Sequence, residues 1–291
     1  MTAKKKYIAF CNQHADIIPV FLRAIWLDAV AEKWNVILQE EDNEIKAALP
    51  YCTKGNILTN RIYLPDVSFY QSIIFLQHYT AKQQQAISEN LFRQLPHTLK
   101  SYFKFLPEYS NIDLHALKYK SEVYPTYCIK KKSEISLSTN HARNVQKGMK
   151  NQYIISESKN ISISYALLAS TFIRQNLQIK LSFELYKKLQ HITQKNGMGK
   201  TLDCIDQRNN VLASILIVED AKCVYYLYGG YDTSYKNSGA MTFLLHYIIQ
   251  DTIQRHKIFN FCGSSKKSIA NFFEGFGAKK TSIPIWKKSI Y

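Results

Sequence analysis

The chain has 291 residues, of which 46% are apolar and 21% charged, and its 38 Lys and Arg against 22 Asp and Glu give a formal net charge of +16. This length and composition exclude global disorder and allow two domains, while no run of about 18 apolar residues is available to span a membrane. The positive charge predicts an anionic partner, and composition alone leaves open whether that is nucleic acid, a membrane surface or a phosphorylated small molecule.

In the first half of the chain, the sequence predicts a hairpin, three further strands and a helix. Residues 35–51 form the hairpin around the turn residues Glu41-Asp42-Asn43. Residues 62–69 are predicted to form a strand, in which Pro65 requires an edge or a bulge. A helix is indicated by the apolar spacing of residues 80–95, and the extended segments are 102–106 and 123–129.

The second half is predicted to alternate between helices and strands. Helices are expected over 141–151, 164–175, 183–197, 239–256 and 268–273, and strands over 201–206, 211–218, 224–228, 258–261 and 281–286. Each half contains a strand–turn–strand unit followed by a further strand and a helix. This repeated order predicts the duplication of one α/β module, which fits the usual size of a domain.

The positive charge is concentrated in the second half. Residues 1–128 hold 14 Lys and Arg against 12 Asp and Glu, a net of +2, whereas residues 129–291 hold 24 against 10, a net of +14. We therefore expect the anionic partner to bind the second half.

The six cysteines form no C-x-x-C pair and have no histidine at zinc-ligand spacing. They are interpreted as buried thiols in a reducing compartment, without a metal site. The basic N-terminus leads into no apolar segment, so we expect no secretion signal and a cytoplasmic protein.

A candidate phosphate-binding segment precedes the helix at 239–256. Asn237, Ser238, Gly239 and Ala240 open this helix. A helix N-terminus presents free backbone N–H groups and the positive end of a dipole to a pyrophosphate or carboxylate, and small residues allow a close approach. The alternative interpretation is an ordinary Asn/Ser cap with a glycine that serves packing.

Several stretches resemble a known group of proteins. YYLYGGYDTSYKNSGAMTFLLHYII (225–249) and FNFCGSSKKSIANFFEGFGAKK (259–280) resemble the C-terminal part of Fem aminoacyltransferase-like proteins of the GNAT superfamily. LSTNHARNVQKGMK (137–150) resembles that group's Arg-Asn-x-x-Lys helix, and residues 26–51 resemble its N-terminal module. The resemblance implies an α/β fold of two tandem GNAT-like modules, each a mixed, mostly antiparallel sheet flanked by helices. Residues 1–128 would be a degenerate module, and 129–291 would bind the substrates.

The resemblance implies a bacterial N-acyltransferase, which moves an acyl or aminoacyl group to an amine acceptor by direct transfer in a ternary complex. The phosphate-bearing donor would be acyl-CoA, such as acetyl-CoA, or aminoacyl-tRNA, and no metal is expected. Acyl-CoA users typically carry Gln/Arg-x-x-Gly-x-Gly/Ala at the helix start, whereas Lys236 and Met241 occupy the first and last of these positions here. The alternative is a non-catalytic protein that binds a polyanion, either tRNA or a phosphorylated cell-envelope precursor. Peripheral membrane contact also stays open.

Within this framework, Tyr228 is the candidate acid or oxyanion donor, and Asp232 the candidate base or amine-positioning group. The segment from Asn237 to Ala240 is the candidate cofactor-binding loop. The candidates for substrate binding are Arg143, Lys147, Tyr226 and Lys236. Strand alternation places Tyr226 and Tyr228 on one face of the sheet. The competing interpretations are a solvated basic helix face, packing tyrosines and a turn-forming Asp.

Overall fold

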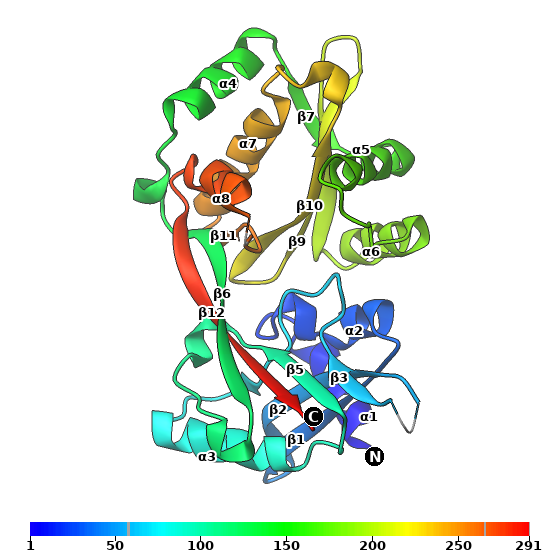
Figure 1. The fold of residues 1–291 in the computed structure, drawn as a ribbon, viewed down its shortest axis with the longest axis vertical. Helices are drawn as coiled ribbons and strands as arrows, with labels where there is room; N and C mark the ends of the chain where they lie inside the picture. Colours follow the sequence, from blue (N-terminus) through cyan, green and yellow to red (C-terminus); the bar gives the residue numbers. More distant parts are fainter. Residues whose placement is uncertain (57–58, 265, 291) are drawn as a thin grey trace. The chain divides into compact units, whose positions relative to one another are not determined.

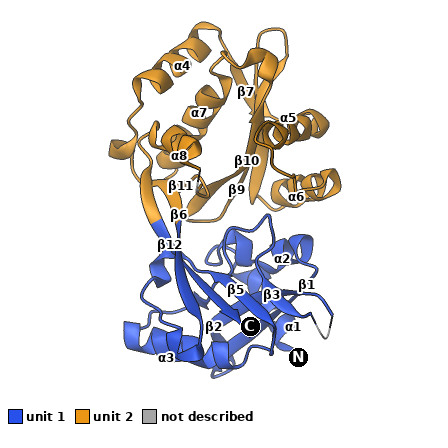
Figure 2. Cartoon of the chain, in the orientation of Figure 1, with its two compact units in different colours: residues 1–124, 282–291 blue, residues 125–281 orange. Residues whose placement is uncertain are grey.

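The computed structural model describes residues 1–56, 59–264 and 266–290. The chain forms two compact units (Figure 2): unit 1 contains residues 1–124 together with the C-terminal residues from 282, and unit 2 contains residues 125–281. The chain therefore passes between the units twice. Both crossings fall inside strands, β6 (Lys120–Ile129) and β12 (Lys279–Ser289), so each of these strands contributes to both units.

Unit 1 is a sheet with helices packed against it (Figure 1). Its strands follow the order β1-β2-β3-β5-β12, and β4 pairs with β2. Its helices are α1 (Ala3–Gln13), α2 (Ala24–Val30) and α3 (Ala81–Arg93), and its remaining strands are β1 (Lys33–Glu41), β2 (Glu44–Lys54), β3 (Arg61–Tyr63), β4 (Ile74–Phe75) and β5 (Lys100–Lys104).

The elements predicted in unit 1 form for the expected local reasons, with one exception. The β1–β2 hairpin turns at Asp42 and Asn43, which both have positive φ. Helix α3 starts with a reciprocal capping box between Thr80 and Gln83. The predicted strand at 62–69 is wrong beyond Tyr63, where β3 ends. Pro65, two residues later, lacks the N–H that would continue the ladder.

Unit 2 is a sheet with helices on both faces (Figure 1). Its strand order is β6-β11-β10-β9-β8-β7, antiparallel except for the parallel pair β10–β11. Helices α5 and α6 pack on β8, β9 and β10, and α4 packs on α7. Its helices are α4 (Thr139–Lys150), α5 (Ile161–Arg174), α6 (Phe183–Lys195), α7 (Ala240–Gln254) and α8 (Lys267–Glu274), and its further strands are β7 (Ile154–Glu157), β8 (Gly199–Ile205), β9 (Val211–Glu219), β10 (Cys223–Tyr231) and β11 (Ile258–Asn260).

The expected fold class, two units that each contain a mixed, mostly antiparallel sheet flanked by helices, is confirmed. The core of unit 2 lies between α7 and the sheet, where Leu244, Leu245, Ile248 and Ile249 are at most 1% exposed. Burying one such side chain stabilises the fold by about 1.5–3 kcal/mol. None of the helices in the described part of the chain has the length and apolar character that a membrane span needs.

Candidate functional site

The candidate site of unit 2 starts where two neighbouring strands separate. Strand β10 pairs in parallel with β11 only over Cys223–Tyr225, opposite Ile258–Asn260. Its antiparallel pairing with β9 continues to Tyr231. Residues 226–231 of β10 are therefore held by β9 on one side only. The candidate residues Tyr226 and Tyr228 belong to this half-paired segment.

A β-bulge at Leu227 decides which way the two tyrosines point. Tyr226 lies opposite Ile217, and Tyr228 lies opposite the adjacent residue Leu216, so β10 has one residue more than β9 at this point. The extra residue inverts the alternation. The Tyr226 ring packs on Phe261 and Phe273 with centroid distances of 6.4 and 6.3 Å, whereas Tyr228 lies 6.3 Å from Phe172 of α5. The prediction that both tyrosines share a face is therefore wrong.

The glycine pair that follows the bulge makes room for different neighbours. A Cβ on Gly229 would overlap the hydroxyl of Tyr226, and a Cβ on Gly230 would overlap the carbonyl of Leu167 in α5. Burial raises the pKa of Tyr226 well above its usual range, so this hydroxyl keeps its proton at neutral pH and does not act as a base.

Asp232 begins the loop beyond β10, and its side chain caps the first turn of this loop. Its Oδ1 accepts a hydrogen bond of 2.8 Å from the Ser234 N–H at the start of a single 3₁₀ turn, Thr233–Tyr235. This is the turn-forming role that the sequence offered as the alternative. Lys236 ends the same turn, and its side chain is exposed.

The candidate cofactor loop packs against α4. Gly239 has φ +75°, and a Cβ there would lie 2.9 Å from Cβ of Asn144. The Ala240 N–H donates to Ser238 Oγ at 3.2 Å. The glycine thus allows α4 and α7 to approach, and no side chain caps the first turn of α7 at its N-cap position. The close approach that the sequence expected for a ligand is made here by a helix.

Two side chains bind the carbonyl groups of this loop. Lys147 Nζ donates to the Asn237 carbonyl, and the Tyr153 hydroxyl donates to the Ser238 carbonyl at 3.3 Å. Arg143, one turn earlier on α4, is exposed. The structure therefore brings Lys147 to the loop, with Arg143 on the same helix. The sequence did not identify Tyr153, whose only signal is its position just before β7.

His141 fixes the start of α4 and was also missed. Its Nδ1 lies 2.8 Å from Ser138 Oγ, and its Nε2 lies 3.0 Å from the carbonyl oxygen of Phe272 in α8. Its ring centroid is 4.4 Å from that of Phe276, and Gly275 leaves space for it, because a Cβ there would overlap the imidazole. Burial lowers the pKa of His141. The available signal was the spacing from the N-cap residue Ser138.

Unit 1 contains a hydrogen-bonded chain of Asp113, His115 and Ser121. His115 Nδ1 is 2.6 Å from Asp113 Oδ1, and Nε2 is 3.1 Å from Ser121 Oγ. A nucleophilic triad also needs donors for an oxyanion. The nearby N–H groups of Lys118 and Tyr119 already donate to the carbonyls of His115 and Leu114. The three side chains are exposed, and we assign this series of hydrogen bonds a structural role.

Among the described residues, no group of three His, Cys, Asp or Glu side chains is placed to hold a metal ion. All six cysteines are free thiols, and five of them are buried.

Residues 97–279, more than half of the chain, match the FemAB family. The chain belongs to the FemAB family. The resemblance seen in the sequence is thereby confirmed, and the match contains α4, β10, the α7 loop and α8. A search of curated protein sequences gives no significant match.

Solved structures share the fold of this FemAB protein at low identity. FemX has a TM-score of 0.68 with 11% identity, over 98% of this chain and 96% of its own. The C-terminal domain of a putative lysylphosphatidylglycerol synthetase from Agrobacterium fabrum has a TM-score of 0.62 with 9% identity, over 98% of this chain and 92% of its own. L-PGS from Bacillus licheniformis has a TM-score of 0.61 with 10% identity, over 99% of this chain and 92% of its own. At these identities the likeness shows the fold alone.

We predict that Gly230→Ala lowers the free energy of unfolding by about 2–3 kcal/mol, because the new Cβ would have to displace the backbone of α5. Gly197→Ala is the matched control: Gly197 has φ +61° and open space around it, so this change introduces backbone strain alone, about 1 kcal/mol. Urea denaturation monitored by circular dichroism measures the free energy of unfolding of both variants. A loss in Gly230→Ala no larger than in Gly197→Ala would show that the approach of α5 is not tight.

We predict that His141 makes stability depend on pH. The pKa of His141 is lower in the folded chain than in the unfolded chain, so the unfolded chain binds the proton more strongly. Above the unfolded pKa of about 6.5, protonation of His141 costs the fold nothing. As the pH falls from that value towards the folded pKa, the free energy of unfolding decreases by up to about 1.4 kcal/mol per pH unit.

His141→Leu should therefore lose less stability than the native chain between pH 7 and 5, in urea denaturation at each pH. Burial also lowers the pKa of His246, so His246→Leu is measured in parallel to separate the two contributions. Equal pH slopes in the native chain and His141→Leu would contradict this assignment.

Proposed function

We propose that this FemAB protein is an aminoacyltransferase that uses aminoacyl-tRNA as the donor and an amine as the acceptor. FemX and the two lysylphosphatidylglycerol synthetase structures share the fold, which supports a transferase of this general kind. The amine nitrogen attacks the ester carbonyl that joins the amino acid to the ribose. A C–N bond forms, the C–O ester bond breaks, and the proton of the amine passes to the departing ribose oxygen.

The observation that carries this choice of donor is the contact between α4 and the loop before α7. Acyl-CoA would need the backbone N–H groups of Ser238 to Ala240 for its pyrophosphate. Asn144 lies against Gly239 there, Lys147 and Tyr153 bind the loop carbonyls, and the Ala240 N–H donates to Ser238. These contacts support a donor that does not enter this loop.

The charge distribution supports the same choice. Exposed cations of unit 2 include Arg143, Lys147 and Lys150 on α4, the run Lys130–Lys132, and Lys236. Phosphates along a nucleic acid suit such a spread of cations, because each contact releases condensed counterions. A compact pyrophosphate would need only a few of them.

The candidate residues keep separate roles in this proposal. Asp232 has one carboxylate oxygen on the Ser234 N–H, and its second oxygen has no hydrogen bond within the described residues, so it is available to hold the attacking amine. Tyr228 would donate to the oxyanion of the tetrahedral intermediate. Tyr226, on the opposite face, would contribute to substrate binding.

We expect tRNA to bind tightly with a steep salt dependence, and acetyl-CoA to leave the melting temperature unchanged. Arg143→Ala and Lys147→Ala should weaken tRNA binding and each reduce the slope of log K against log salt by about 1. Lys82→Ala, an exposed lysine on α3 of unit 1, is the matched control. Fluorescence anisotropy measures tRNA binding, and thermal shift measures the effect of acetyl-CoA. Stabilisation by acetyl-CoA without tRNA binding would reverse the choice of donor.

We also predict that Tyr228→Phe lowers the transfer rate by about 100-fold, the usual loss when one oxyanion donor is removed. The assay follows a labelled amino acid from aminoacyl-tRNA to a lysine-containing peptide. Tyr226→Phe should mainly raise KM, because the bulge sends its hydroxyl to the other face. Tyr102→Phe in unit 1 is the control. If Tyr228→Phe transfers as fast as Tyr102→Phe, the catalytic assignment is wrong, and tRNA binding without transfer would favour the non-catalytic alternative.

A further inference from the structure

The C-terminal end of α5 lies beside the segment where β10 and β11 separate. Phe172 in the last turn of α5 contacts Tyr228 in the half-paired segment of β10. Arg174 is the last residue of the helix, and Gln175 follows it as the C-cap residue. The side chains of Arg174 and Gln175 make contacts in two different directions, one towards β10 and the other towards α8.

Arg174 extends from one face of β10 to the other. Its guanidinium carbon lies 4.2 Å from the centre of the Tyr231 ring, and one of its nitrogens donates to Thr171 Oγ1 at 3.0 Å. The Tyr231 ring packs against the core on the side of α7, whereas α5 covers the opposite face of β10 (Figure 1). Strand β9 pairs with Tyr231 along one edge of β10, and β11 does not extend this far along the other. The absence of a ladder to β11 here leaves room for the Arg174 side chain.

Gln175 makes the second contact, towards α8. Lys266, the N-cap residue of α8, donates from Nζ to Gln175 Oε1 at 3.1 Å. Helix α8 lies on the side of α7, because its Phe273 belongs to the core between α7 and the sheet. This hydrogen bond therefore also joins the two faces of the sheet. One cation, Arg174, thus lies over the end of β10, and the other, Lys266, belongs to the segment that follows β11.

Both cations are held in place by neutral groups. The partners of Arg174 are a hydroxyl and an aromatic ring, and the partner of Lys266 is an amide. Both side chains are exposed, and within residues 1–56, 59–264 and 266–290 neither forms an ion pair. Positive charges that are already positioned and have no carboxylate partner suit an anionic ligand, because little side-chain freedom is lost on binding.

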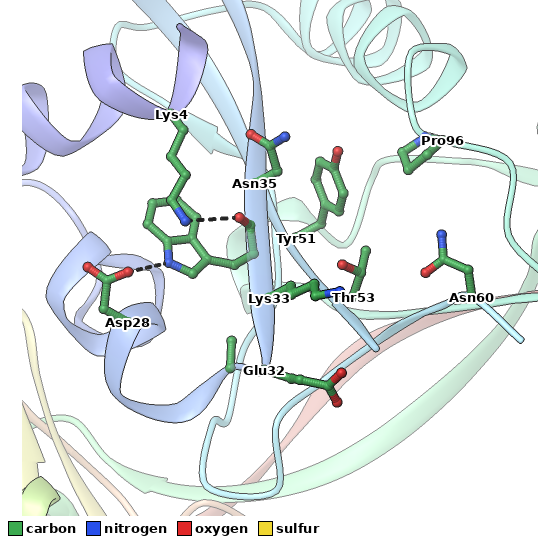
Figure 3. Close-up of a pocket in the computed structure, with 11 residues that line it drawn as sticks. Lys4, Asp28, Glu32, Lys33, Asn35, Tyr51, Thr53, Asn60 and Pro96 are labelled. Carbon is green, nitrogen blue, oxygen red and sulfur yellow. Dashed lines mark hydrogen bonds between the residues drawn. The ribbon is translucent and has the colours of Figure 1, made fainter. Parts of the chain in front are cut away.

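A cation beside an aromatic ring also occurs in unit 1, where it has a structural role. It borders a pocket of about 560 Å³ at the start of β1 (Figure 3). Lys4 Nζ lies 4.1 Å from the centre of the Trp34 ring and donates to the Trp34 carbonyl at 3.2 Å, while Asp28 accepts the Trp34 Nε1–H. Lys4 thus satisfies a backbone carbonyl, which explains its position. The side chains of Arg174 and Lys266 satisfy no carbonyl within the described part of the chain, so this explanation does not apply to them.

We propose that Arg174 and Lys266 bind phosphates of the single-stranded 3′ end of the donor tRNA, beside the half-paired segment of β10. Arg174 offers a planar group with several donors to a phosphate, and Lys266 offers a point charge. The Tyr231 ring with its stacked guanidinium is also a surface on which a base can stack. The ester bond then lies near Tyr228. This inference rests on the proposed use of aminoacyl-tRNA and adds the position of its reactive end.

The test compares two RNAs by fluorescence anisotropy, the intact tRNA and the same tRNA without its last three nucleotides. In the native chain, this truncation should weaken binding at least about fivefold, because phosphate contacts are lost. Arg174→Ala and Lys266→Ala should bind intact tRNA more weakly, and the truncation should then cost each only about twofold, since one contact is already missing. Lys222→Ala, an exposed lysine just before β10, is the matched control and should respond like the native chain.

The salt dependence separates charge from packing. Arg174→Ala and Lys266→Ala should each reduce the slope of log K against log salt by about 0.7, the value for one phosphate on a single strand. Arg174→Lys keeps the charge and should keep the slope. Gln175→Ala removes the group that positions Lys266, so it should weaken binding with the slope unchanged. Thermal melting confirms that each variant is folded.

Two results would overturn this assignment. One is equal binding of the intact and the truncated tRNA by the native chain. The other is that Arg174→Ala and Lys266→Ala respond to the truncation as Lys222→Ala does. In both cases the proposed use of tRNA would still stand. If the native chain binds neither RNA, the proposed function itself is wrong, and this inference is wrong with it.

Discussion

The unequal pairing of β10 is the constraint on which the candidate site depends. Its ladder with β9 extends six residues past the end of its ladder with β11, from Tyr226 to Tyr231. The segment without a ladder to β11 is short and carries a bulge, which limits strand addition by another chain. It lies at the centre of a sheet, where a strand normally pairs on both sides. The bulge and the two glycines lie within this segment, and the loop before α7 follows it.

Helix α4 contacts both segments that follow the separated strands β10 and β11. His141 joins its first turn to α8, while Asn144 and Lys147 join it to the loop before α7. One helix thus holds both segments that follow the parted strands. The interactions are mostly with backbone carbonyls, so they depend on where α4 lies more than on the identity of the loop residues. This explains how the loop can depart from the pattern of acyl-CoA users and still be ordered.

The order of most elements was predictable because their signals are local. Ser138 and Ser182 cap α4 and α6, close to the predicted helix starts at 141 and 183, and the turn of the β8–β9 hairpin falls between the strands predicted at 201–206 and 211–218. Helices α1 and α2 were missed; α2 has only seven residues, too short for a clear helical period. Within the site, the bulge at Leu227 could not be predicted, because it depends on the register between β10 and β9 and not on residues 226–228 alone. The role of Gly239 needed knowledge of α4, which lies almost a hundred residues earlier.

The path of the chain through its two units has a consequence for synthesis. Unit 2 is continuous, whereas unit 1 takes a strand from residues after 281. Strand β12 pairs with β5 through Ile285 to Ser289, and its Trp286 is buried in unit 1. Unit 1 begins to be synthesised first, but its sheet needs β12 from the end of the chain. As the chain leaves the ribosome, unit 2 can therefore complete its sheet before unit 1 can. Until residue 289 emerges, β5 has an open edge, and the N-terminal part of the chain is the part most exposed to aggregation and to proteases.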